Sequence, residues 1–226
     1  METLPAGDYV NFAFYRMRRE WKKLDVREKE VCIQDFQGAL ERFSEQIWLR
    51  SYATTGFRGD VDFLLWSVTR ELPLIQDLAV AVAKSDLSYY MELPYSYLAM
   101  TRESMYVKGH KNPLPQGGEE GARWLFIYPF VKTRDWYKLP FETRQRMMRE
   151  HFQVGHQFPG VKINTTYSFG LDDQEFVLAF EADSPKEFQD LVMKLRESEA
   201  SSYTLRDVPI FTCLRKPLED ILRALS

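Results

Sequence analysis

The sequence is poor in the features that mark several common classes of protein. Lysine and arginine number 30 against 33 acidic residues, and the net charge of −3 gives no basic surface of the kind that binds nucleic acid. The longest apolar runs, such as LAVAVA at 78–83, are too short to span a bilayer. The opening residues, METLPAGDYV, contain no basic segment followed by an apolar run, so no signal peptide is expected.

Few residues are available for metal or phosphate sites. The only cysteines, Cys32 and Cys213, are expected to be reduced, buried thiols of a cytoplasmic protein. No HxxxH or CxxC spacing occurs among the three histidines and two cysteines, which argues against a zinc site, and there is no glycine-rich phosphate loop. Aromatic residues, by contrast, make up 15% of the chain, which suits a thick core or a pocket for a large flat ligand.

The chain contains an internal repeat. Four blocks of the first half have counterparts in the second: 13–36 with 128–151, 57–66 with 169–180, 75–78 with 188–191, and 93–102 with 207–215. The offset stays between about 111 and 115 residues throughout, whereas chance matches would scatter. With 226 residues, the chain is long enough for two fused halves. We therefore expect a duplicated domain.

Each half is predicted to run strand, helix, strand, strand, helix, strand. The pattern indicates strands at 9–17 and 123–132, helices at about 26–49, 140–155 and 185–201, a hairpin around 170–173, a last strand in VPIFTCLR and a short helix at 217–225. This order is ferredoxin-like. The predicted fold class is α+β, a duplicated ferredoxin-like fold of the dimeric α/β-barrel type, with two antiparallel sheets and helices outside.

The expected domain organisation follows from the repeat. Residues 1–105 form the first ferredoxin-like half, and residues 123–226 form the second. Between them, residues 106–122 are rich in glycine, proline and charge and are predicted to be a long surface loop, a class of segment that often acts as a lid.

The two copies differ in chemistry at particular positions. Aligned without a gap, Ala13 falls on Tyr128, Met17 on Lys132 and Phe36 on His151. Duplicated halves need the same core, so polar residues present in only one copy are candidates for function.

His151 lies near the end of the predicted helix 140–155. It is interpreted either as a helix-end histidine favoured by the helix dipole or as a metal or heme ligand facing a cavity between helix and sheet. A ligating histidine needs a carboxylate or carbonyl on its other nitrogen, and Glu199 is a plausible source.

Tyr128, Phe130 and Lys132 share one face of the predicted strand because side chains alternate with period two. Pro129 indicates an edge or a bulge there. A strand tyrosine is commonly structural, and a strand-end lysine is commonly solvated. If this face is enclosed, however, Lys132 needs an anionic partner, which a propionate or carboxylate would provide.

The motifs YPFVK, DWYKLP, MMREH, NTTYSFGLDDQEFVLAFEAD and DVPIFT resemble the chlorite dismutase family, most strongly over 123–215 and nearest to its coproheme-decarboxylating members. The resemblance implies a heme site in the second half. It implies His151 as proximal iron ligand and Glu199 as its hydrogen-bond acceptor. Tyr128 matches the tyrosine that forms a radical, and Lys132 the lysine near a propionate. The heme-side residues are then Trp136, Tyr137, Phe130 and Asn164.

Two positions separate the activities within the family. Members that decompose chlorite have a distal arginine thirteen residues after the proximal histidine, where this chain has Asn164, or Ile163 or Lys162 with a one-residue gap. They also lack the tyrosine at the position of Tyr128. The resemblance further implies that His110, in the interdomain loop, is the distal base that deprotonates peroxide.

The activity implied is peroxide-dependent oxidative decarboxylation of two propionates of iron-coproporphyrin III, giving heme b through a tyrosyl radical. The porphyrin would be substrate and redox cofactor together. The alternatives are chlorite decomposition to chloride and oxygen, and a heme-binding protein without turnover. The resemblance also implies a homopentamer and transient contact with coproporphyrin ferrochelatase, and no nucleic acid partner or membrane span is expected.

Overall fold

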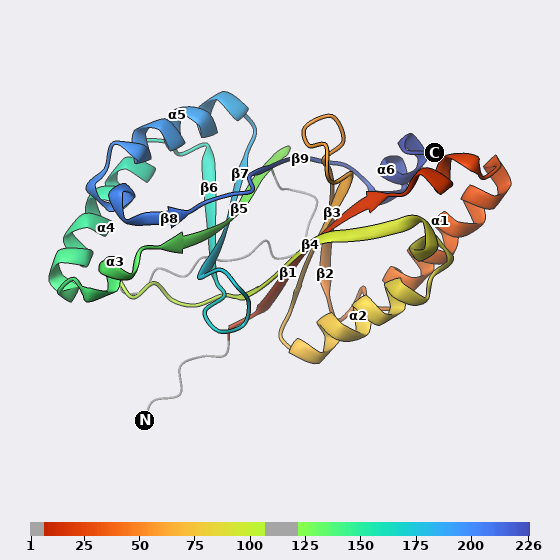
Figure 1. Ribbon diagram of the computed structural model, residues 1–226, viewed down its shortest axis with the longest axis horizontal. Helices are drawn as coiled ribbons and strands as arrows, with labels where there is room; N and C mark the ends of the chain where they lie inside the picture. Colours follow the sequence, from red (N-terminus) through yellow and green to blue (C-terminus); the bar gives the residue numbers. More distant parts are fainter. Residues whose placement is uncertain (1–6, 107–121) are drawn as a thin grey trace. The chain divides into compact units, whose positions relative to one another are not determined.

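The computed structural model describes residues 7–106 and 122–226, which separate into two units (Figure 1). The first unit consists of Met1–Met100 together with Cys213–Ser226, and the second of Thr101–Thr212. Within the described residues, no helix has both the length and the apolar character needed to cross a bilayer.

The first unit has the predicted order of elements. Its elements are β1 (Tyr9–Met17), the 3-10 helix η1 (Arg19–Lys23), α1 (Val26–Glu41), β2 (Trp48–Ala53), β3 (Phe63–Thr69), α2 (Leu72–Lys84), the 3-10 helix η2 (Asp86–Tyr90), β4 (Met91–Met100), the last three residues of β9 (Phe211–Arg215) and α6 (Leu218–Ala224). The strands pair antiparallel in the order β4-β1-β3-β2, the ferredoxin-like arrangement.

Helix α1 is shorter than the sequence predicts. It begins at a capping box, in which the side chain of Asp25 accepts from the Glu28 N–H and the Glu28 side chain accepts from the Asp25 N–H. It ends at Glu41 rather than near residue 49. The residues that follow include Trp48–Ala53, which form β2 and pair with β3, so the predicted helix range was wrong at its end.

The second unit repeats the same order. Its elements are β5 (Trp124–Lys132), α3 (Arg134–Lys138), α4 (Phe141–Gly155), β6 (Val161–Tyr167), β7 (Phe176–Ala182), α5 (Pro185–Arg196), the 3-10 helix η3 (Glu199–Tyr203) and β8 (Thr204–Arg206). The strand order is β6-β7-β5-β8, again ferredoxin-like. The predicted hairpin is confirmed, with Gly170 at its turn in the left-handed region at φ +73°.

Helix α5 also ends earlier than predicted. Ser184 accepts from the Glu187 N–H and Pro185 is the first residue of the helix, so the predicted start at residue 185 is confirmed. The helix stops at Arg196, and Glu199 begins a separate 3-10 helix rather than continuing α5. Glu199 therefore belongs to a different element from α5.

The C-terminal segment differs most from the prediction. The predicted last strand, VPIFTCLR, is shorter in the structure, where β9 covers Phe211–Arg215 and its Leu214 and Arg215 pair with β2. A separate short strand, β8, precedes it and pairs with β5. Residues 213–226 therefore belong to the first unit, although the sequence places them in the second half. Helix α6 follows and adds Ile221 and Leu222 to the core of the first unit.

Candidate functional site

The two units differ in how their helix-facing cores are filled. In the first unit, the buried apolar residues on the helix side of the sheet form one cluster, which contains Ala13 and Phe36 and against which Met17 packs. In the second unit they form two clusters. One joins the sheet and α5 (Phe126, Tyr128, Val161, Phe180, Ala182, Phe188, Leu191), and the other joins α3, α4 and η3 (Trp136, Met147, Ala200). The polar residues of the second copy therefore occupy positions that the first copy fills with core side chains.

Tyr128 lies in the sheet-side cluster. Its ring stacks on Phe180 of β7 at a centroid distance of 5.6 Å and an interplanar angle of 19°. Burial raises the pKa of its phenol, the negative charge of Asp207 raises it further, and Arg196 opposes this. At neutral pH Tyr128 is therefore a protonated phenol in an apolar environment. Such a group can give up an electron only if its proton leaves with it.

Lys132 lies between the two clusters. Its ammonium donates to the Ala200 carbonyl of η3 at 2.7 Å and lies 4.5 Å from the ring centroid of Trp136 and 5.3 Å from that of Phe130. Its side chain is buried. Burial lowers the pKa of Lys132 to about 8, against the opposing effect of the Glu175 charge. The amine is thus largely charged at neutral pH, in a place where a cation is costly without an anion nearby.

His151 projects from the last turns of α4 and is half-buried. Burial, with the nearby charge of Lys132, lowers the pKa of its imidazole to about 4. The ring is therefore neutral at pH 7 and has a lone pair free for a metal. The helix dipole alone would favour the charged form, so the interpretation as a dipole-stabilised helix-end cation does not fit these surroundings.

Helix α3 contributes two aromatic residues. Trp136 is buried, with ring centroids 5.6 Å from Tyr203 and 6.4 Å from Tyr106. Tyr137 is half-buried, and its hydroxyl donates to Glu175 at 2.5 Å. The sequence comparison of the two halves did not single out Glu175, because an acid after a turn is usually solvated. Its burial and its bonds to this cluster make it part of the site.

Glu199 has a different partner from the expected one. Its carboxylate is about half exposed and accepts from Arg146 of α4 at 2.8 Å, which holds the pKa of the carboxyl below its usual range. Arg146 lies on the same helix as His151, so Glu199 is adjacent to the predicted helix but paired with another side chain. Its bond to His151 stays a prediction.

Asn164 does not share a face with Tyr128. Ile163 packs against the sheet-side cluster that contains Tyr128, and Asn164, its neighbour on β6, points to the other face of the sheet. There Asn164 donates to the buried carboxylate of Glu181 at 3.1 Å. Of these two positions, only Ile163 lies on the face that carries Tyr128, and neither position supplies a cation. His110 lies outside the described residues.

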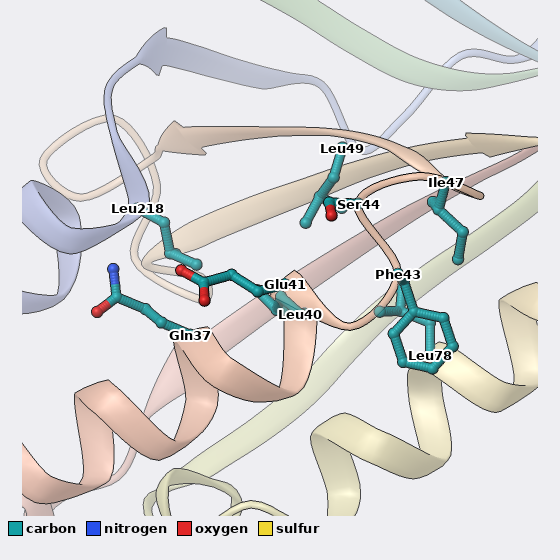
Figure 2. Close-up of a pocket in the computed structure, with 9 residues that line it drawn as sticks. All are labelled: Gln37, Leu40, Glu41, Phe43, Ser44, Ile47, Leu49, Leu78 and Leu218. Carbon is teal, nitrogen blue, oxygen red and sulfur yellow. The ribbon is translucent and has the colours of Figure 1, made fainter.

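The described residues contain no group of three or more histidine, cysteine, aspartate or glutamate side chains placed to hold a metal. A pocket of about 220 Å³ lies in the first unit (Figure 2) and differs from the candidate site in the residues that line it. It is lined mainly by apolar side chains: Gln37, Leu40, Glu41, Phe43, Ser44, Ile47, Leu49, Leu78 and Leu218. It offers no histidine, lysine or tyrosine, so the candidate site remains the helix side of the second unit.

Comparison with known proteins agrees with this arrangement. The family model for chlorite dismutase matches residues 29–216, which include all the described residues of the candidate site. The chain belongs to the chlorite dismutase family. The resemblance that the sequence motifs indicate is therefore confirmed, and the fold class with it.

Two curated relatives carry different activities in their names. The coproheme decarboxylase of Mycolicibacterium smegmatis is 32% identical over 175 residues, covering 77% of this chain and 75% of the relative. The chlorite dismutase of Ideonella dechloratans is 25% identical and covers 97% of this chain and 80% of the relative. A solved variant of the chlorite dismutase of Candidatus Nitrospira defluvii matches with a TM-score of 0.89 at 25% identity, over 97% of this chain and 95% of that one.

Proposed function

We propose that the protein converts iron-coproporphyrin III to heme b by peroxide-dependent decarboxylation of two propionates. One observation carries the proposal: a neutral histidine, a charged lysine and a buried tyrosine take the positions that Phe36, Met17 and Ala13 fill in the core of the first unit. An iron porphyrin with carboxylate side chains matches this set of groups.

The residues fit such a ligand by their chemistry. The uncharged imidazole of His151 can bind ferric iron, and the ammonium of Lys132 can pair with a propionate. Trp136, Tyr137 and Phe130 offer aromatic surface for a flat macrocycle. When bound, the porphyrin iron supplies two-electron reduction of peroxide. We retain Glu199 as the proposed partner of His151 and His110 as the proposed base that takes the peroxide proton.

The proposed part of Tyr128 is to relay oxidation to the propionate. Tyr128 loses an electron and its proton, and the resulting radical removes a β-hydrogen from a propionate, which restores the phenol. Loss of one more electron and of carbon dioxide then leaves a vinyl group. Each propionate thus yields a vinyl group, carbon dioxide, one proton and two electrons, and those electrons reduce one peroxide with two protons to two waters. Two peroxides are consumed for each heme b.

The direct test is to add iron-coproporphyrin III and hydrogen peroxide to the purified protein and to identify the product by mass spectrometry. We expect heme b and two molecules of carbon dioxide for each porphyrin. Titration should show one porphyrin per chain, because the first unit has no counterparts of His151 and Lys132. A porphyrin that binds but keeps its four propionates would instead indicate a heme-binding protein.

Chlorite decomposition is the competing activity, and β6 argues against it. The strand Val161–Tyr167 contains no arginine, and Ile163 takes the place facing the helices. Oxygen release from chlorite at a rate far above that of heme b formation would contradict the proposal. We also propose that the protein works in the cytoplasm as a homopentamer in transient contact with coproporphyrin ferrochelatase, and sedimentation would test the oligomer.

Binding should depend on pH through Lys132. Its pKa of about 8 means that the ammonium is charged below that pH and neutral above it. A propionate is attracted only by the charged form, so affinity should fall about tenfold as pH rises through about 8, which corresponds to about 1.4 kcal/mol. Iron-free coproporphyrin III is the suitable probe, because no iron-bound water then titrates. Lys132→Met should bind about tenfold more weakly and lose this pH dependence, whereas Lys162→Met, at an exposed lysine on β6, should keep it.

Glu199→Ala should keep porphyrin binding but change the iron–histidine bond. If Glu199 accepts from the imidazole in the loaded protein, its removal makes His151 a weaker donor and lowers the iron–imidazole stretching frequency in the resonance Raman spectrum. Arg146→Ala is the matched control, because it removes the partner that Glu199 has in the structure and leaves the carboxylate free for His151. An unchanged frequency in Glu199→Ala would assign the carboxylate to the ion pair with Arg146 alone.

A further inference from the structure

Glu175 is a buried carboxylate at the edge of the candidate site. It precedes β7 directly, and its residue is 7% exposed. A carboxylate in such a place is costly unless several donors satisfy it. Two hydrogen-bond donors and one nearby cation do so, and they come from the last residue of β5 and from α3.

The donors meet on one side chain. Oε2 of Glu175 accepts from the Lys132 backbone N–H at 2.8 Å and from the Tyr137 hydroxyl at 2.5 Å. Its other oxygen lies 3.9 Å from the Arg134 guanidinium, which is largely exposed. The Glu175 backbone is fixed as well, since its N–H donates to the Phe130 carbonyl at 3.3 Å. Glu175 therefore joins the strand end that bears Lys132 to the helix that bears Tyr137.

We propose that Glu175 is a positioning residue, which sets the place of Lys132 and the orientation of the Tyr137 ring in the porphyrin site. This inference rests on the proposed function for its ligand. The hydroxyl of Tyr137 is held in a bond to the carboxylate, so the ring has one favoured orientation before any ligand arrives. A site held in this way loses less conformational entropy on binding.

The geometry also separates two effects of the carboxylate. As an acceptor, one Glu175 oxygen holds two donors in place. Burial contributes most to the raised pKa of the Tyr137 phenol, and both the hydrogen bond to Glu175 and the charge of Glu175 raise it further. Glutamine at this position keeps a carbonyl acceptor and removes the charge, whereas leucine of similar size removes both. The two variants therefore distinguish positioning from electrostatics.

The first measurement uses the protein without porphyrin. Ultraviolet difference titration should show one tyrosine ionising at lower pH in Glu175→Leu and in Glu175→Gln than in the wild type. That tyrosine should be absent when Tyr137→Phe is added. If no tyrosine shifts in either variant, Glu175 does not hold Tyr137 and the inference is overturned.

The second measurement is the dissociation constant of iron-coproporphyrin III in a double-mutant cycle. Glu175→Leu should weaken binding about tenfold and Glu175→Gln about twofold or less, because glutamine retains the acceptor. In the Tyr137→Phe background the effect of Glu175→Leu should shrink, since part of its role passes through that ring. If the fold changes in dissociation constant caused by Glu175→Leu and Tyr137→Phe simply multiply in the double variant, Glu175 does not act through Tyr137.

Glu181→Gln is the matched control, because Glu181 is likewise a buried glutamate but lies on β7 and bonds to Asn164, on the face of the sheet away from Tyr128. It should leave both measurements unchanged, and an equal loss of affinity in this variant would reduce Glu175 to a general structural role. If Glu175→Leu fails to fold, Glu175→Gln still gives the tyrosine titration. A wild type that binds no porphyrin would refute the proposed function, while the titration would still decide whether Glu175 holds Tyr137.

Discussion

Tyr128→Phe is expected to bind iron-coproporphyrin III nearly as tightly as the wild type and to release no carbon dioxide when peroxide is added. Phenylalanine keeps the ring that stacks on Phe180 at 5.6 Å, so the fold and the site should keep their shape. It lacks the hydroxyl, and a phenyl ring cannot supply the electron and proton that the relay needs. The loss should fall on turnover and hardly on binding, as for an interaction made only along the reaction path.

The measurement is the yield of heme b and carbon dioxide under conditions that convert all the porphyrin in the wild type. We expect a fall of at least about a thousandfold in rate, together with slow bleaching of the porphyrin, because the oxidising equivalents then have no productive acceptor; a thousandfold corresponds to about 4 kcal/mol. Wild-type yields from Tyr128→Phe would show that the tyrosine is only structural.

Tyr15→Phe is a close control for this experiment. Tyr15 lies on β1 of the first unit, stacks on Phe63 at a centroid distance of 5.0 Å, and is buried to the same extent as Tyr128, with 8% exposure. Removing its hydroxyl makes the same chemical change in the unit that carries no candidate site. Carbon dioxide release should be unaffected, so any general effect of losing a buried phenol would be detected separately.

His151→Ala should remove the iron–imidazole bond and weaken binding of iron-coproporphyrin III by at least about a hundredfold. Binding of iron-free coproporphyrin III should change much less, because Lys132 and the aromatic side chains remain. The checks are the resonance Raman iron–imidazole band and the two dissociation constants. His156→Ala, at the exposed histidine that ends the same helix, should leave all three unchanged. An iron–imidazole band that persists in His151→Ala would refute the assignment.

The same variant has an effect without porphyrin. The pKa of His151 is about 4 in the folded protein, below the ordinary value near 6.5 that the unfolded chain has. The unfolded state therefore binds more protons between these values, and folding stability falls as pH decreases through about 6.5 towards 4. His151→Ala removes this contribution, so its unfolding midpoint should depend less on pH in that range than the midpoint of the wild type.

The fold could be predicted from the sequence because the chain contains an internal repeat. Strands 9–17 and 123–132 were predicted closely, since both are dense in aromatic and β-branched residues. The end of α1 was not, because Trp48–Ala53 carries apolar residues that suit a helix or a strand, and only pairing with β3 decides between them. The pairing of β9 with β2 of the first unit was not predicted. It depends on contacts between residues more than a hundred positions apart in the chain, which a local sequence pattern cannot show.

Residues of the candidate site could be predicted from the sequence where the two halves differ, but not where their role depends on the direction of a side chain. Tyr128, Lys132 and His151 were found because the other copy has core residues there. Glu175 was missed because its role depends on burial and on two donors from another segment. Asn164 was assigned to the site by counting thirteen residues from His151. An error of one residue in such a count places the side chain on the opposite face of the strand.

The helix-side core of the second unit is divided into two clusters, which should make local unfolding of α4 easier than that of α1. The cluster formed by Trp136, Met147 and Ala200 is small, and it joins α3, α4 and η3 without sharing members with the sheet-side cluster. Amide hydrogens in α4 should therefore exchange with solvent through local opening at a lower free energy than those of α1, whose Phe36 lies in a continuous core. A porphyrin bound between helix and sheet would complete that core, so slower exchange confined to α4 would report occupancy before any chemistry takes place.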